Sequence, residues 1–317
     1  MHTMLEKRIT LPYIELLSAP SELIAWFSQN FIFGGKYSEV LNLLIDNDLL
    51  VEAMWVVRHI DASSSSGEII MVEAKDVLRK GSIITPYYLE SKDKLLVEGH
   101  IMARQGIFCR GLLATENGDI WTLGDIVCGG ISTDNLYVNK DCICYGEVKA
   151  KSSIVVNGNI EASDDIEAGG KILAHSIDCE TNISSGGSIL TAGELRAEYS
   201  IFAEEEIYSK GSISASDSIE SGVEIASRRN IFCSHGAIYS GGGIYAKGAI
   251  SSADSITGMS DVMANNQIEA YEIQAEGVIY PDQAETEENN QEDFCDEKNM
   301  RVKLAKKLSQ VFLRRKS

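Results

Sequence analysis

Large aliphatic residues recur every six positions over much of this chain. Between Ile160 and Ile273, sixteen of the nineteen intervals between successive aliphatics are six residues, two are five and one is seven. An amphipathic helix would repeat at three and four residues, so this spacing excludes a long helix. A fixed period sustained over many copies indicates a solenoid of stacked repeats.

A small residue follows each of these aliphatics two positions later. The series is Ala162, Ala168, Ala174, Cys179, Ser185, Thr191, Ala197, Ala203, Ser209, Ala215, Ser221, Ser227, Cys233, Ser240, Ala246, Ser252, Gly258, Ala264, Ala270 and Ala275. Because residues i and i+2 of a strand point to the same face, each unit predicts a short strand that places one large and one small residue inward. Glycine or aspartate often precedes the aliphatic by two positions and would form the turns.

The repeat continues upstream in weaker form and ends near Pro281, so the rod is expected over residues 81–281. Three strands and three corners would use about 18 residues, which gives about eleven coils and a length of about 50 Å at 4.8 Å per stacked strand. The expected fold is mainly β: a single-stranded triangular β-helix, that is, a β-solenoid. A small α-helical region would precede it and an amphipathic helix would follow it.

Residues 1–80 do not repeat. Helices are expected after Ser18–Glu22, over Tyr37–Ile45 and over Leu49–Val57. Two interpretations stay open for this region: a cap that covers the first coil, or a helical module that recognises a partner.

Two segments of opposite charge follow the rod. Residues 282–299 are acidic and polar, which is typical of a disordered linker. Residues 300–317 are basic, and Val302, Leu304, Leu308, Val311 and Phe312 would share one face of a helix. This helix could dock onto the acidic solenoid, or it could lie on a membrane surface.

The outward residues on one side of the expected rod form a candidate protein interface. On two sides, the residue after each aliphatic is of mixed type. On the third side these residues are Met102, Trp121, Tyr137, Val155, Leu173, Leu190, Tyr208, Ala226, Tyr245 and Met263, spaced 16 to 19 residues apart. None of the ten is charged or strongly polar. An uncovered stripe of this length would exceed the apolar patch that a soluble monomer usually exposes.

Charge and cysteine content narrow the class of partner and the compartment. The formal net charge is −19, which makes nucleic acid and anionic membranes poor partners for the body of the chain. Membrane contact is expected only through residues 300–317. Seven cysteines without zinc-site spacing and an N-terminus without a secretory signal favour a cytoplasmic protein.

No catalytic, cofactor-binding or metal-binding residue is predicted. His175 and His235 lie three coils apart, roughly 15 Å along the axis, so they cannot share a metal. Gly241–Gly243 lacks the helix and the Lys-Ser/Thr pair of a phosphate loop. Between residues 148 and 279 no insertion exceeds one residue, so no loop builds a cleft there.

Units such as Gly158-Asn159-Ile160-Glu161-Ala162 and Gly211-Ser212-Ile213-Ser214-Ala215 resemble the repeats of bactofilins and related polymer-forming solenoids. The resemblance covers about 200 residues and consists of a periodic pattern. It implies a cytoskeletal type of protein, with a right-handed triangular β-helix that polymerises end to end.

The chain also resembles the hexapeptide-repeat acyltransferases, whose β-helices are left-handed, but it departs from their order. Their small residue lies two positions before the aliphatic, where this chain has Asp164, His175, Tyr199, Glu205, Asp217 and Arg229. These residues cannot all be buried. The order therefore favours right-handed coiling.

Three functions remain open from the sequence. The first is a non-enzymatic scaffold that binds a protein partner or itself, as a homo-oligomer, through the apolar stripe. The second is an acidic inhibitor, such as a toxin-neutralising immunity protein. The third is an acyltransferase-like enzyme of the hexapeptide type.

Overall fold

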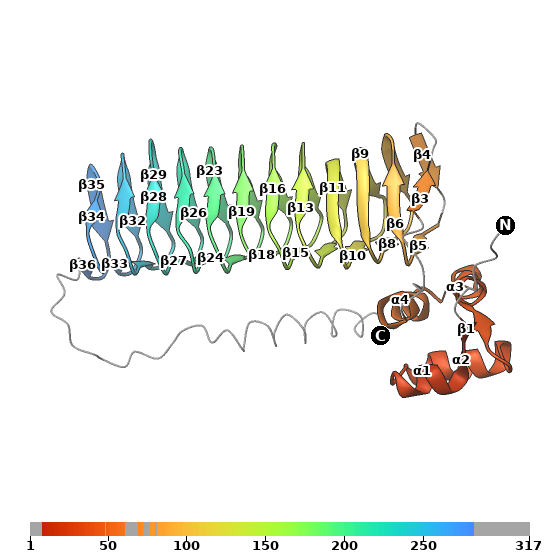
Figure 1. The fold of residues 1–317 in the computed structure, drawn as a ribbon. Helices are drawn as coiled ribbons and strands as arrows, with labels where there is room; N and C mark the ends of the chain where they lie inside the picture. Colours follow the sequence, from red (N-terminus) through yellow and green to blue (C-terminus); the bar gives the residue numbers. More distant parts are fainter. Residues whose placement is uncertain (1–7, 48, 61–68, 73–75, 80, 282–317) are drawn as a thin grey trace.

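The chain forms a β-solenoid of about 11 coils with a group of short helices at its N-terminal end (Figure 1). This computed structural model describes residues 8–47, 49–60, 69–72, 76–79 and 81–281. Each strand pairs in parallel with a strand one coil away, about 18 residues along the chain. Ile154, for example, is opposite Ile172.

The strands form three parallel ladders, here called faces A, B and C. Face A is a 12-stranded sheet of β5 (Ile83–Thr85), β8 (Ile101–Ala103), β10 (Ile120–Thr122), β12 (Leu136–Val138), β15 (Ile154–Val156), β18 (Ile172–Ala174), β21 (Ile189–Thr191), β24 (Glu206–Ser209), β27 (Glu224–Ser227), β30 (Ile244–Ala246), β33 (Val262–Ala264) and β36 (Ile279–Pro281).

Faces B and C complete each coil. Face B contains β3 (Ile69–Val72), β6 (Tyr88–Ser91), the first part of β9 (Gly106–Thr115) and of β11 (Asp125–Thr133), β13 (Cys142–Cys144), β16 (Ile160–Ala162), β19 (Ile177–Cys179), β22 (Leu195–Ala197), β25 (Ile213–Ala215), β28 (Ile231–Cys233), β31 (Ile250–Ser252) and β34 (Ile268–Glu269). Face C contains β4 (Asp76–Arg79), β7 (Lys94–Val97), the second part of β9 and of β11, β14 (Val148–Ala150), β17 (Ile166–Ala168), β20 (Ile183–Ser185), β23 (Ser200–Ala203), β26 (Ser218–Ser221), β29 (Ala237–Ser240), β32 (Ser255–Gly258) and β35 (Glu272–Ala275).

The core of the rod consists of the inward aliphatic and small residues that the period predicts. Ile160, Ile213 and Ile244 are fully buried, and each is opposite an aliphatic or a cysteine of the neighbouring coil. The six-residue repeat thus corresponds to one strand and one corner, and three repeats make one coil.

Corners bring the backbones of successive coils into close approach. A Cβ on Gly124 would lie 1.6 Å from the carbonyl oxygen of Gln105 in the preceding coil. Only glycine fits at such a position, because any side chain would push the coils apart.

The N-terminal region contains four helices and a two-stranded ladder. β1 (Arg8–Ile9) pairs antiparallel with β2 (Gly35–Lys36). The helices are α1 (Leu11–Leu16), α2 (Ser21–Asn30), α3 (Tyr37–Asp46) and α4 (Leu50–His59). The last three lie close to the ranges expected from the sequence, whereas α1 is additional. Ile14, Leu23, Phe27, Val40 and Val56 form their shared core.

The rod begins earlier than the sequence predicts, and the segments expected after it are not described. β3 and β4 extend the ladders upstream to Ile69, before the residue 81 at which the repeat becomes visible in the sequence. The expected linker 282–299 and helix 300–317 lie outside the described residues. No helix among the described residues is long and apolar enough to cross a membrane.

Candidate interaction surface

The ten residues of the predicted apolar stripe lie in one continuous ladder on face A. Each is the outward residue directly after an inward aliphatic, and each is opposite the next in register, from Met102–Trp121 to Tyr245–Met263. Ile84 and Tyr280 extend the ladder at its two ends. The sequence analysis missed both, although each directly follows an aliphatic of the repeat. We call these twelve residues the stripe.

The equivalent outward ladders on faces B and C are polar or mixed. Arg196 and Asp178 form an ion pair across two coils of face B at 3.7 Å. Lys149 and Glu167 form another on face C. Charged pairs of this kind are well solvated and need no cover. Face B has a short apolar run, Phe108, Val127 and Ile143, but among the described strands only face A has an apolar ladder along its whole length.

Burial along the stripe decreases from the N-terminal end of the rod to the C-terminal end. Met102 is 2% exposed and Leu173 is 7% exposed, whereas Met263 reaches 36% and Tyr280 reaches 48%. Leu190 and the stripe residues that follow it, up to Tyr245, are partly buried. The stripe therefore has a covered first half and an exposed far end.

The N-terminal helices cover the first coils of the stripe. α4 packs against β5, and the Arg104 guanidinium, just after β8, donates a hydrogen bond to the Ile60 carbonyl at 2.6 Å. Ile84, Met102 and Trp121 belong to the same apolar cluster as the helix residues. Figure 1 shows the helices beside this end of the rod. The helices thus pack on face A beside the first coils of the rod.

Acidic residues line one edge of the stripe near its exposed end. Glu206 lies two residues before Tyr208, on the same side of β24, and is opposite Glu224 of β27. Burial, and then the charge of Glu206, raise the pKa of the Glu224 carboxyl. Burial raises the pKa of the Tyr245 hydroxyl, and the negative charges of Glu224 and Asp261 raise it further. Among the described residues, neither glutamate forms an ion pair.

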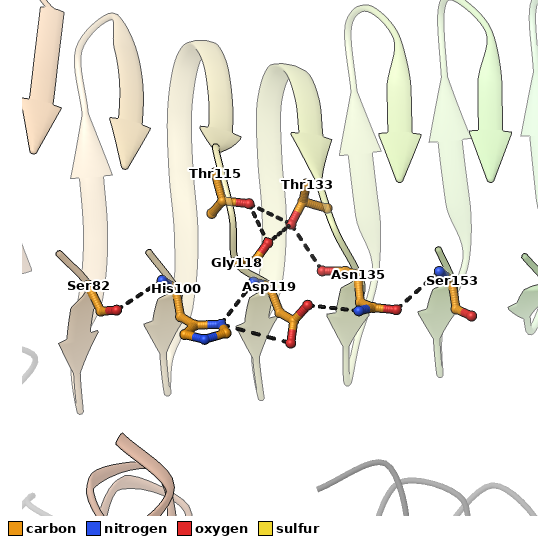
Figure 2. A network of polar contacts seen from close by, with 8 residues as sticks. All are labelled: Ser82, His100, Thr115, Gly118, Asp119, Thr133, Asn135 and Ser153. Carbon is orange, nitrogen blue, oxygen red and sulfur yellow. Dashed lines mark hydrogen bonds and ion pairs between the residues drawn. The ribbon is translucent and has the colours of Figure 1, made fainter. Parts of the chain in front are cut away.

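Polar residues of successive coils form a hydrogen-bonded ladder at the corner before face A (Figure 2). Ser82, His100, Asp119, Asn135 and Ser153 each directly precede an inward aliphatic. The His100 amide donates to the Ser82 hydroxyl at 2.9 Å, and the Ser153 amide donates to Asn135 Oδ1 at 3.1 Å. Each bond joins one coil to the next, so the ladder fastens the corners.

This ladder contains a serine, a histidine and an aspartate, but its geometry is not that of a nucleophilic triad. His100 Nδ1 accepts a hydrogen bond from the Asp119 amide at 2.9 Å, so this nitrogen carries no proton. The ring lies 3.8 Å from the Asp119 carboxylate. Ser82 contacts the backbone of His100 and accepts the bond, whereas a nucleophile would donate to the ring. The arrangement holds the corner and activates no hydroxyl.

Buried hydroxyls in the small inward positions also serve the corners. The Ser221 hydroxyl donates to the Glu205 carbonyl of the preceding coil at 2.5 Å, and the Ser185 hydroxyl donates to the Gly170 carbonyl at 2.5 Å. The Thr133 hydroxyl likewise donates to the Gly118 carbonyl of the preceding coil, and the Thr115 hydroxyl donates to the same carbonyl from within its own coil (Figure 2). Each of these carbonyls also accepts a backbone N–H from the next coil, so the hydroxyl adds a second hydrogen bond at the corner.

The described cysteines are buried, free thiols: Cys109, Cys128, Cys142, Cys144, Cys179 and Cys233. Burial is the main reason why the pKa of the Cys109, Cys142, Cys179 and Cys233 thiols is raised. The Cys128 thiol donates a hydrogen bond to Cys144 Sγ at an Sγ–Sγ distance of 3.8 Å, and this contact raises the pKa of the Cys128 thiol. The same contact lowers the pKa of the Cys144 thiol, which is also enclosed in the core. Enclosed thiols are poor nucleophiles. In the described part of the chain, no three metal-ligating side chains cluster.

A shallow depression of about 480 Å³ lies along the corner between faces A and B. Charges of both signs border it, including Glu161, Asp178, Arg196 and Arg229. Asp178 and Arg196 already pair with each other, and the lining contains no histidine or cysteine. The depression therefore offers no combination of groups suited to catalysis.

Comparisons with known proteins do not assign the chain to a family. No protein-family model matches the chain, and neither the curated proteins nor the solved structures contain a significant match.

Proposed function

We propose that this protein is a non-enzymatic scaffold that binds another protein through the exposed end of the stripe, Met263 and Tyr280. The observation that carries the proposal is the one-sided distribution of apolar residues: face A alone has an unbroken apolar ladder, and its last members are uncovered. Aromatic and methionine side chains are enriched at the centres of protein interfaces.

The last coil supports the same location. Val278, Ile279 and Tyr280 are 57%, 43% and 48% exposed, so apolar surface continues from the stripe to the end of the rod. β36 also has an unpaired edge within the described chain, and such an edge favours association with further strands. A second copy of this chain could bind there, as the resemblance to polymer-forming solenoids implies.

The finer features of the fold belong to this proposal. We infer a three-sided, right-handed coil, because the small residue follows the aliphatic in every repeat and the three ladders have equal period. The unpaired buried thiols support a reducing, cytoplasmic compartment. No observation favours the acidic inhibitor or the acyltransferase over the scaffold, and both remain untested hypotheses.

A pair of matched variants tests the interface. Met263→Glu and Tyr280→Glu place a charge on the exposed end of the stripe, whereas Thr257→Glu and Gln274→Glu place it on face C of the same coils. Light scattering of the purified chains measures self-association, and capture from native lysate measures partner binding.

We expect association or capture by the wild type to be lost in the two stripe variants and kept in the two controls. Loss of self-association identifies a second copy as the partner, and loss of one captured protein identifies a different one. A wild type that neither associates nor captures, or controls as defective as the stripe variants, would contradict the proposal.

A further inference from the structure

The middle of the stripe is buried beyond the point where the N-terminal helices meet the rod. Val155 is 6% exposed and Leu173 is 7% exposed. They lie three and four strands beyond β8, which is about 14 and 19 Å at 4.8 Å per strand. α4 packs against α3 and β5, and the Ile60 carbonyl after it accepts a hydrogen bond from Arg104, directly after β8.

An outward position on this rod is not buried by its own ladder. On faces B and C, the outward residues Phe202, Phe232 and Tyr239 remain 42%, 47% and 42% exposed, although each has neighbours in the adjacent coils. Tyr137 occupies the same kind of position on face A and is only 6% exposed. The middle of the stripe, which shares one apolar cluster with the N-terminal helices, therefore packs against a segment outside its own ladder.

We propose that this segment is residues 301–317 of the same chain, which lie along the stripe between Tyr208 and Tyr137 in the helical form that their sequence predicts. A helix of 17 residues is about 25 Å long, at 1.5 Å per residue. The distance from β24 to β12 is four strands, about 19 Å. The proposed helix matches the buried middle of the stripe and the first of its partly buried residues, and it leaves Met263 and Tyr280 uncovered.

The position of the last strand makes this docking possible. β36 belongs to face A, so the chain leaves the rod on the same face as the stripe. Residues 282–299 then connect it to the proposed helix. A flexible linker of 18 residues has a typical end-to-end distance of about 23 Å, close to the roughly 19 Å from β36 to β24.

Charge favours the same occupant. Residues 301–317 contain seven lysines and arginines and no acidic residue. The linker delivers Arg301 and Lys303 near Glu206 and Glu224, whose stacked carboxylates pair with no cation among the described residues. The apolar residues of the segment would then face Leu190, Leu173 and Val155. This inference concerns the middle of the stripe and does not depend on a partner at its exposed end.

Limited trypsin digestion of the full-length chain tests the docking, because the segment is rich in cleavage sites. The variants are Leu190→Glu on the stripe and Leu308→Glu in the segment. Their matched controls are Phe202→Glu on face C and Ser309→Glu, which add the same charge nearby. Mass spectrometry measures the rate of cleavage within residues 301–317 at several protein concentrations, and circular dichroism checks that each rod is folded.

We expect both test variants to be cleaved about tenfold faster than the wild type or more, since one buried leucine contributes over a factor of ten to a local equilibrium. The controls should stay within about twofold. Equal cleavage in all five proteins would overturn the proposal. Protection that grows with protein concentration would assign the site to a second copy and would also overturn it. Leu308→Glu cannot unfold the rod, so its result remains decisive if Leu190→Glu lowers stability.

Discussion

Substituting two neighbouring residues in β25 by the same amino acid separates the inside of the rod from the outside. Ile213 points inward, is fully buried and lies opposite Leu195 and Ile231. Ser214 points outward and lies opposite Arg196. Ile213→Asp and Ser214→Asp therefore add the same group at adjacent positions with different surroundings.

The structure gives very different costs for the two changes. Removing a buried isoleucine side chain costs about 2–5 kcal/mol. A carboxyl group without a hydrogen-bond partner adds about 1–3 kcal/mol, even if it takes up a proton. The sum of about 3–8 kcal/mol approaches the whole stability of a typical domain, about 5–15 kcal/mol. Ser214→Asp should change stability by less than about 0.5 kcal/mol, because its carboxylate stays in water beside a cation.

Thermal unfolding followed by circular dichroism, together with hydrogen exchange of residues 207–219, measures the difference. Because each coil contacts only its neighbours, the damage from Ile213→Asp should be local. We expect fast exchange in these residues and slower exchange near Ile120, about five coils away. Equal loss of melting temperature in the two variants would refute the six-residue assignment of inward and outward positions.

Three further predictions follow from the corners and the core. Ser221→Ala should lower the free energy of unfolding by about 1 kcal/mol in chemical denaturation, because it removes the hydrogen bond to the Glu205 carbonyl; no change would show that this bond is dispensable. Hydrogen bonds from Thr181 and Asn182 lower the pKa of Asp165, so its stabilisation is present above the ordinary value of 3.8 and is lost as pH falls through the lowered one. Asp165→Asn should therefore lower the melting temperature at pH 7 and not at pH 2, and an equal deficit at both would contradict this linkage. The six buried thiols should resist iodoacetamide until the chain is unfolded, as peptide mass spectrometry would show, and labelling of Cys128 in the native state would disprove its enclosure.

The long-range polar contacts could not be predicted from the repeat alone. The sequence marks Ser185 and Ser221 as small inward residues, but not as donors to the corner carbonyls of the preceding coil. Which carbonyl lies within reach depends on the rise between coils and on the path of each corner. The same holds for His100, whose contact with Asp119 arises only when two residues 19 positions apart are stacked.

The first strands of the rod could not be predicted from the six-residue pattern, because they do not carry it. β3 and β4 lie upstream of the first clear repeat because pairing with β6 and β7 decides their conformation. A strand at the end of a ladder needs only one neighbour, so its sequence can depart from the six-residue pattern. Likewise β9 and β11 pass through a corner without a turn, and their register shifts between Cys128 and Gly130.

The sequence by itself determined the solenoid, its period and ten of the twelve members of the stripe, since strand geometry assigns alternate residues to opposite faces whatever the rest of the fold does. Only the tertiary structure decided which part of the stripe is covered. Met102 and Met263 follow the same rule along the chain, yet one is 2% exposed and the other is 36% exposed. The difference arises because helices distant in sequence pack against the first coils, and packing between distant segments depends on shape and position that a local repeat does not encode.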